Sequence, residues 1–233
     1  MAIDQYLISE RFTGIVATYA AAGRGQISYW GGNYFLMNNS GEEDNALELW
    51  KRPSNGSTFL FQKTIAAGGA LRGLCNDGKF IYSLESLGSF ATIRKFTIDG
   101  MEVDVAAIAS GDNCRGLTCD SNVGTNNELN WGMSKYLYTM WYDTRGSKWY
   151  MYQYDWNKKK VVKQTFFALT TNFERPIELT FNGKNIFIIS DNSLACVFRQ
   201  LSLPDYLNMK SLAILDHYDG VTFDGKYFWL CQE

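Results

Sequence analysis

One short pattern recurs along this chain: an apolar stretch, a turn of the Asp-Gly, Asn-Gly or Gly-Gly type, and a stretch rich in tyrosine, phenylalanine and tryptophan. Three clear copies are "RGLCNDGKFIYSL" at 72–84, "IELTFNGKNIFII" at 177–189 and "GVTFDGKYFWL" at 220–230. A weaker copy, "ISYWGGNYFLM", spans 27–37, and a fifth, "RGLTCDS" at 115–121, resumes as "KYLYTMW" at 135. Such turns supply the positive φ angles of tight hairpins, and aromatic residues favour strands. The pattern predicts five repeated β-hairpins.

The spacing of these hairpins indicates the size of the repeating unit. The first strands begin at Ile27, Gly73, Gly116, Glu178 and Gly220, so the steps are 46, 43, 62 and 42 residues. A polar excursion at 122–134 lengthens the third step, and without it that step falls to about 49 residues, near the 40–50 residues of a propeller blade. Each unit also contains a second hairpin-like stretch, at 47–65, 92–109, 148–167 and 195–215.

The two ends of the chain complement each other. The last repeat supplies only two strands, and the segment "QYLISERFTGIVATYA" before the first repeat can form two more. A ring closed in this way leaves no open radial edge. The sequence therefore predicts one all-β domain, 1–233, folded as a five-bladed β-propeller with four-stranded blades. Residues 1–21 complete the blade begun by 219–233, 122–134 are an insertion in the third blade, and one short helical turn is expected at 205–209.

Composition narrows the classes of function and location. The 22 basic and 24 acidic residues nearly cancel, so nucleic acid is not an expected partner. No apolar run of about 18 residues exists, which predicts no membrane insertion. The N-terminus lacks the basic and apolar regions of a secretory signal. Five cysteines without C-x-x-C spacing favour reduced structural thiols. These features predict a cytoplasmic protein, or a virion component if the protein is viral.

The anchor "GVTFDGKYFWL" resembles the blade signature of NHL, YVTN and lactonase-like β-propeller repeats, and the five-bladed size is similar to that of tachylectin-type propellers. The resemblance covers most of the chain as a period, whereas the Gly-His and Trp-Asp pairs of WD repeats are absent. It implies that a ligand sits at the propeller axis, on the face where loops enter the first strand of each blade. Fold alone does not transfer a function.

Charged residues occupy the positions that this resemblance places around the axis: Arg72, Arg115, Arg175, Glu178 and Asp219. A mixed ring of guanidinium and carboxylate groups can hold a polar ligand through bidentate hydrogen bonds. The same groups can instead pair with one another. We predict a ligand-binding site at this ring and leave both alternatives open.

Other candidate groups lie on loops. Carboxylates expected between second and third strands suit a cation or paired acid–base catalysis, although most acidic loop residues are simply solvated; they are Glu42, Glu43, Asp44, Glu85, Asp143 and Asp191. We predict no metal, no cofactor and no catalytic residue. Trp131, Trp141 and Tyr142 are candidates for stacking on a sugar or a protein partner, with core packing as the alternative.

These features favour a non-catalytic binding or assembly module that presents a rigid propeller surface, such as a structural, virion or receptor-facing component. The expected partner is a protein or a glycan, and a homo-oligomer or larger assembly fits the same reading. Two alternatives stay open. A carbohydrate-binding lectin would show Trp or Tyr in shallow pockets between blades, and a glycosidase- or lactonase-like hydrolase would show at least two axial carboxylates in a deep pocket.

Overall fold

The computed structural model describes residues 2–8, 12–20, 25–40, 45–54, 58–67, 71–87, 90–110, 114–121, 132, 134–169, 174–192, 195–214 and 217–232. These residues form twenty β-strands and contain no helix. The all-β class predicted from the hairpin pattern is confirmed. The helical turn expected at 205–209 is wrong, because 203–205 form a hydrogen-bonded turn and a strand already begins at Asn208.

The described strands pair into five four-stranded antiparallel sheets. Four sheets are each continuous in the sequence. The first contains β3 (Ile27–Gly31), β4 (Tyr34–Ser40), β5 (Asn45–Lys51) and β6 (Leu60–Ala67), and the second contains β7 (Leu71–Asn76), β8 (Ile81–Leu87), β9 (Phe90–Phe96) and β10 (Glu102–Ser110). The third contains β11 (Cys114–Cys119), β12 (Tyr136–Asp143), β13 (Lys148–Asp155) and β14 (Lys160–Phe166), and the fourth contains β15 (Arg175–Phe181), β16 (Ile186–Asp191), β17 (Cys196–Leu201) and β18 (Asn208–Ile214).

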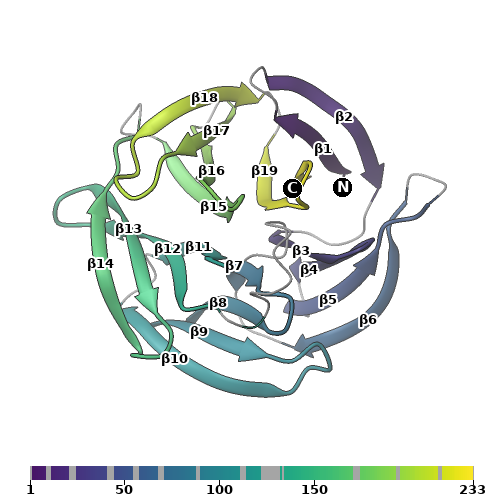
Figure 1. Ribbon diagram of the computed structural model, residues 1–233, viewed down its shortest axis with the longest axis horizontal. Coiled ribbons are helices and arrows are strands. Elements are labelled where there is room, and N and C mark those ends of the chain that lie inside the picture. Colours follow the sequence, from purple (N-terminus) through teal and green to yellow (C-terminus); the bar gives the residue numbers. More distant parts are fainter. Residues whose placement is uncertain are drawn as a thin grey trace.

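The remaining sheet joins the two ends of the chain. It contains β19 (Tyr218–Phe223), β20 (Phe228–Gln232), β1 (Ala2–Ile8) and β2 (Phe12–Ala20), in that spatial order. Strand β1 pairs antiparallel with β20, so that Ile3 lies opposite Cys231 and Tyr6 lies opposite Phe228. The marked termini accordingly lie near each other in Figure 1.

The sheets are arranged around a common axis (Figure 1), which confirms a propeller of four-stranded blades. Strands β3, β7, β11, β15 and β19 lie innermost and contact one another in cyclic order, with β19 returning to β3. Each innermost strand is followed outward by the next strands of its own sheet. The five innermost strands therefore surround the axis.

The repeated turn residues have the role that the sequence predicts. Asp224 Oδ1 accepts hydrogen bonds from the amides of Lys226 and Tyr227, at 2.8 and 2.7 Å, and Gly225 has a φ of 97°. Asp77 and Asn182 accept the corresponding amides in their own turns. A carboxylate or amide that caps a turn with a left-handed glycine fixes the hairpin register.

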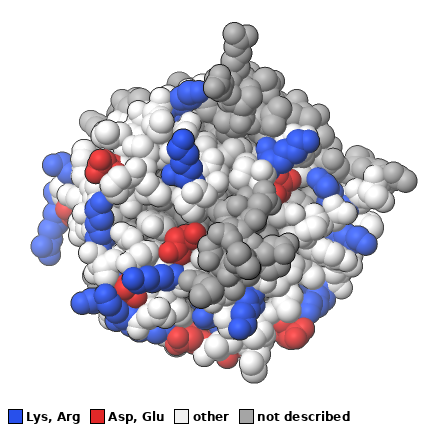
Figure 2. All heavy atoms as spheres, in the orientation of Figure 1, with Lys and Arg blue, Asp and Glu red and all other residues white. Residues whose placement is uncertain are grey.

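Apolar side chains fill the space between neighbouring blades. Phe187, Phe198 and Phe228 form one such cluster, with ring centroids 4.4–5.5 Å apart across two sheets. All five cysteines are buried and free, as expected for structural thiols. Within the described residues, no helix is long and apolar enough to cross a membrane. Basic and acidic side chains alternate over the face drawn in Figure 2, without a large described patch of one sign.

Candidate functional site

A pocket of about 200 Å³ opens at the start of the innermost strands. Five of its lining residues hold the same place in their blades, one position before the residue that begins each repeat, and they are Gln26, Arg72, Arg115, Ile177 and Asp219. Four innermost strands and Gln26, which directly precedes β3, thus supply one side chain each to a single ring, which we call the axial ring. Of the five axial residues predicted from the sequence, the pocket brings together Arg72, Arg115 and Asp219.

Local irregularities in the strands account for this convergence. The pairing register of β7 shifts between Leu71 and Gly73, which leaves Arg72 outside the ladder. Asp219 is left out in the same way between Tyr218 and Gly220. A β-bulge of this kind re-aims the extra residue, and bulges are common beside binding sites. The same shift leaves out Ile177 in β15, so in three of the five blades the bulged residue is the one that lines the pocket.

The glycine after each bulge lets neighbouring innermost strands approach closely. A Cβ atom at Gly220 would lie 2.6 Å from the Gly25 carbonyl oxygen, and one at Gly73 would lie 2.5 Å from the Leu117 amide nitrogen. Both distances are far shorter than van der Waals contact. These two positions therefore accommodate only glycine without a backbone shift, and the axial ring stays narrow.

Glu178 takes the place of this glycine in the β15 blade. It follows Ile177 of the ring, is completely buried, and its Oε1 accepts hydrogen bonds from the amides of Leu117 and Leu179 at 2.7 and 2.9 Å. Its Oε2 has no hydrogen-bond partner among the described residues. Burial raises the pKa of Glu178 well above its usual value, and hydrogen bonds from the backbone of Leu179, Leu117 and Leu74 oppose this shift only partly. Glu178 is therefore a shielded carboxyl group rather than an exposed ligand group.

Polar atoms that the sequence did not single out complete the axial pocket. Asn38 is buried, donates from Nδ2 to Gln26 Oε1 at 3.2 Å, and its Oδ1 has no hydrogen-bond partner among the described residues. Arg72, Arg115 and Asp219 each interact with further groups of the protein. Asp219 also lies close enough to Cys231 that its charge, after burial, helps to raise the pKa of that thiol to about 12.

Arg175 does not join the axial ring. It is the exposed first residue of β15, lies opposite Asp191 in the strand register, and is not among the residues that line the pocket. The sequence placed it at the axis because it precedes the repeat, but Ile177 holds the position equivalent to Arg72. The apolar isoleucine was missed because only charged residues were sought.

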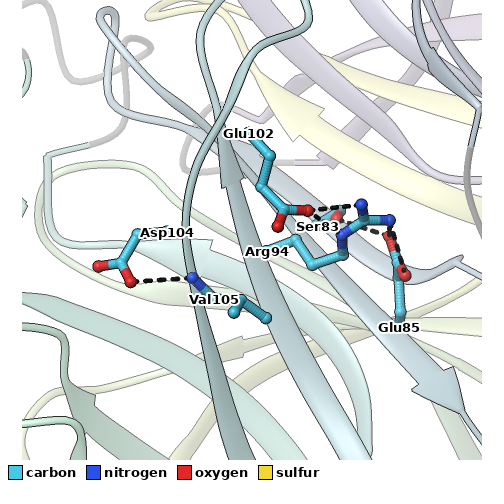
Figure 3. Close-up of polar contacts among 6 residues, drawn as sticks. All are labelled: Ser83, Glu85, Arg94, Glu102, Asp104 and Val105. Carbon is cyan, nitrogen blue, oxygen red and sulfur yellow. Dashed lines mark hydrogen bonds and ion pairs between the residues drawn. The ribbon is translucent and has the colours of Figure 1, made fainter.

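The acidic loop candidates have internal partners. Glu85 is buried and accepts hydrogen bonds from Arg94 at 3.3 Å and from Ser83 at 3.2 Å, while Arg94 also pairs with Glu102 (Figure 3). Asp143 accepts the Arg145 amide, and Asp191 lies 3.6 Å from His217. No cluster suited to a metal ion occurs in the described part of the chain. Glu42, Glu43 and Asp44 lie outside the described residues.

Two of the aromatic candidates, Trp141 and Tyr142, lie on opposite faces of their sheet, because neighbouring strand residues point to opposite sides. Trp141 stacks on Tyr152, with centroids 5.4 Å apart, and packs against the cluster shared with the β7 blade. Tyr142 faces the other way, contacts Trp149 at 5.0 Å and lines a second pocket of about 570 Å³. Trp131 lies outside the described residues, as does most of the predicted insertion.

Comparison with known proteins shows likeness in fold alone. No family model and no curated protein sequence matches this chain. The solved structure of Myxococcus xanthus glutaminyl cyclase is similar over 98% of this chain and 91% of that chain, with a TM-score of 0.62 and 11% identity. A luciferin-regenerating enzyme is similar over 93% and 80%, with a TM-score of 0.51 and 11% identity.

A further similar structure is the hydrazine synthase of Kuenenia stuttgartiensis, with a TM-score of 0.50 and 14% identity. The match covers 91% of this chain and 54% of that chain, so this chain spans about half the length of the hydrazine synthase chain. Identities this low support the propeller arrangement and carry no activity across. The specific NHL or YVTN signature is not shown.

Proposed function

We propose that this protein is a non-catalytic binding module whose axial pocket receives a small polar ligand with a carboxylate group and a hydrogen-bond donor. The observation that carries the proposal is the convergence of five equivalent positions on one pocket. The guanidinium groups of Arg72 and Arg115 suit a carboxylate, because planar forks donate paired hydrogen bonds. The oxygens of Asn38 and Asp219 suit a donor such as an ammonium group.

The carboxylates at the axis favour binding over hydrolysis. Glycoside hydrolysis usually requires two carboxyl groups that flank the scissile bond. Asp219 is the one carboxylate among the lining residues of the axial pocket, and Glu178 is shielded from solvent. The two guanidiniums instead match a ligand that is bound and released unchanged.

The proposal also includes the closure of the propeller by both chain ends, which places Asp219 at the axis. We take the sheet formed by both chain ends as the fifth blade, which makes the module a five-bladed propeller. An assembly role with a protein partner belongs to the same proposal. It is supported by apolar side chains exposed on outer strands and turns, including Phe90 at 56% and Met101 at 64%.

Thermal unfolding with small anions tests the axial site. Acetate, L-glutamate and citrate are compared with inorganic sulfate, followed by isothermal titration of any ligand that binds. A ligand at 100 times its Kd stabilises a folded protein by about 2.7 kcal/mol, or about 5–10 °C for a chain of this size. We expect carboxylates to raise Tm. Arg115→Lys should weaken carboxylate binding at least tenfold, because lysine lacks the bidentate fork of arginine.

Arg145→Lys is the matched control, because Arg145 is an exposed arginine on the β12–β13 turn and is outside the axial pocket. It should leave carboxylate binding unchanged. If none of the three carboxylates raises Tm, or if the two arginine variants behave alike, the axial site is not a carboxylate site.

A further inference from the structure

A second pocket, of about 570 Å³, lies on the same face as the axial pocket but farther from the axis. It is lined by the end of β12, the β12–β13 turn, the start of β13, the end of β14, residues 167–169 and Glu174, which precedes β15. In a four-stranded antiparallel blade, the turn between second and third strands and the entry to the next blade lie on the same face. We call this cavity the side pocket. Its volume is within the range of small-molecule sites.

Aromatic rings form the apolar part of the side pocket. Trp149 and Phe167 are buried, with 9% and 2% of their surface exposed, whereas Phe166 is 50% exposed. Tyr142 is half-buried, and its ring centroid is 5.0 Å from that of Trp149 at an interplanar angle of 40°. The side pocket therefore offers aromatic surface both within its walls and at its mouth.

Polar groups from two separate segments line the same cavity. Glu174 is 3% exposed and is held in a bidentate pair by Arg199, with Nε–Oε1 and Nη2–Oε2 distances of 2.7 and 2.6 Å. This pair fixes the carboxylate and cancels its charge. Ser147 and Lys148 are exposed on the turn, and Lys148 Nζ lies 5.7 Å from the Phe166 ring centroid. The lining thus combines hydrogen-bonding groups with ring faces and has little net charge.

From this combination we propose that the side pocket binds a pyranose sugar ring. A pyranose has an apolar C–H face that stacks on an aromatic ring and a rim of hydroxyl groups that exchange hydrogen bonds with serine, lysine and carboxylate groups. A purely apolar ligand would cover the polar groups of Ser147 and Lys148 without offering them hydrogen bonds, which costs free energy. A small anion would gain nothing from the four aromatic rings. The inference is independent of the axial ring, because the two pockets share no residue.

Saturation-transfer NMR with a panel of methyl pyranosides of neutral hexoses and N-acetylhexosamines, run with a glycan array, tests the proposal. We expect at least one pyranoside to bind, with transfer strongest at the C–H protons of one ring face. Phe166→Ala and Tyr142→Ala should each weaken that ligand at least tenfold. Phe90→Ala removes an equally exposed phenylalanine from the β9 strand and should leave binding unchanged.

The outcomes separate this proposal from the axial one. If no pyranoside and no arrayed glycan binds, the side pocket is not a sugar site. If a sugar binds but its affinity is unaffected by Phe166→Ala and Tyr142→Ala, the sugar site lies elsewhere and the proposal is wrong. The same conclusion follows if sugar binding is lost in Arg115→Lys. Thermal melts of each variant confirm that it is folded. Carboxylate binding at the axial ring should be the same in Phe166→Ala as in the unmodified protein.

Discussion

Because Glu178 is buried, we predict that Glu178→Gln becomes more stable relative to the unmodified protein as pH rises. In the unfolded chain Glu178 ionises near its usual pKa of about 4.3. In the folded protein burial raises this pKa well above that value. The folded state therefore holds the proton more tightly, and its stability falls as pH rises from the unfolded pKa to the folded pKa. One proton corresponds to about 1.4 kcal/mol per pH unit in that interval.

Glu178→Gln removes this titration and keeps the hydrogen bonds. The amide oxygen of glutamine can accept from Leu117 and Leu179 as Oε1 does now. The difference in unfolding free energy between Glu178→Gln and the unmodified protein should be constant below pH 4. Above pH 4 it should grow by about 1.4 kcal/mol per unit, or about 3–5 °C in Tm, until the folded pKa is reached.

Urea unfolding followed by tryptophan fluorescence, from pH 4 to pH 8, measures this difference directly. Titrations that are the same in both proteins cancel when the two curves are subtracted. Parallel curves over the whole range would mean that Glu178 titrates normally in the folded protein, and so is not shielded at the axis. A difference that shrinks as pH rises would mean that the charged form is the one stabilised, which is the opposite of the reasoning above.

Three other predictions concern stability and are read from thermal or urea unfolding. Gly220→Ala should lower the unfolding free energy by about 1–3 kcal/mol, because its Cβ would overlap the Gly25 backbone. Gly146→Ala, whose nearest contact is the Asp143 side chain, should change stability little. Equal effects of the two substitutions would contradict the close approach of the strands. Arg199→Met should cost about 3–5 kcal/mol, because it leaves Glu174 charged and buried, whereas Lys63→Met breaks the exposed pair with Asp99 and should have little effect. Replacing 122–130 with two glycines should leave the fold intact, because the sequence predicts an insertion there and shortening an insertion has a small entropic effect. An unfolded product would show that this segment is structural.

The strand order and the turns were predictable because they depend on local sequence. Asp-Gly and Asn-Gly turns determine where each hairpin reverses, and the observed φ of 83° at Gly78 and 90° at Gly183 matches that requirement. The period of 40–50 residues then gave the four-stranded blade. The helical turn expected at 205–209 was wrong because Pro204 and Asp205 instead lie in the tight turn of the second hairpin predicted at 195–215.

The candidate site was predictable only in part, because its residues meet through contacts between blades. Arg72, Arg115 and Asp219 were found because each is charged and precedes a repeat. Gln26 carries no such signal. The role of Glu178 depends on the Leu117 amide, 61 positions away in the sequence. The side pocket likewise arises from the packing of one blade against the entry to the next, which no local pattern encodes.

Native-state hydrogen exchange at the β1 amides tests the central claim most directly, because the axial ring requires that the two chain ends share one blade. Asp4, Gln5 and Tyr6 lie opposite Leu230, Trp229 and Phe228. We predict that hydrogen-bonded amides in 4–6 and 228–230 exchange slowly and with similar opening free energies, since both strands belong to one cooperative sheet. Fast exchange throughout 4–6, with β20 still protected, would show that the N-terminal strand does not close the ring.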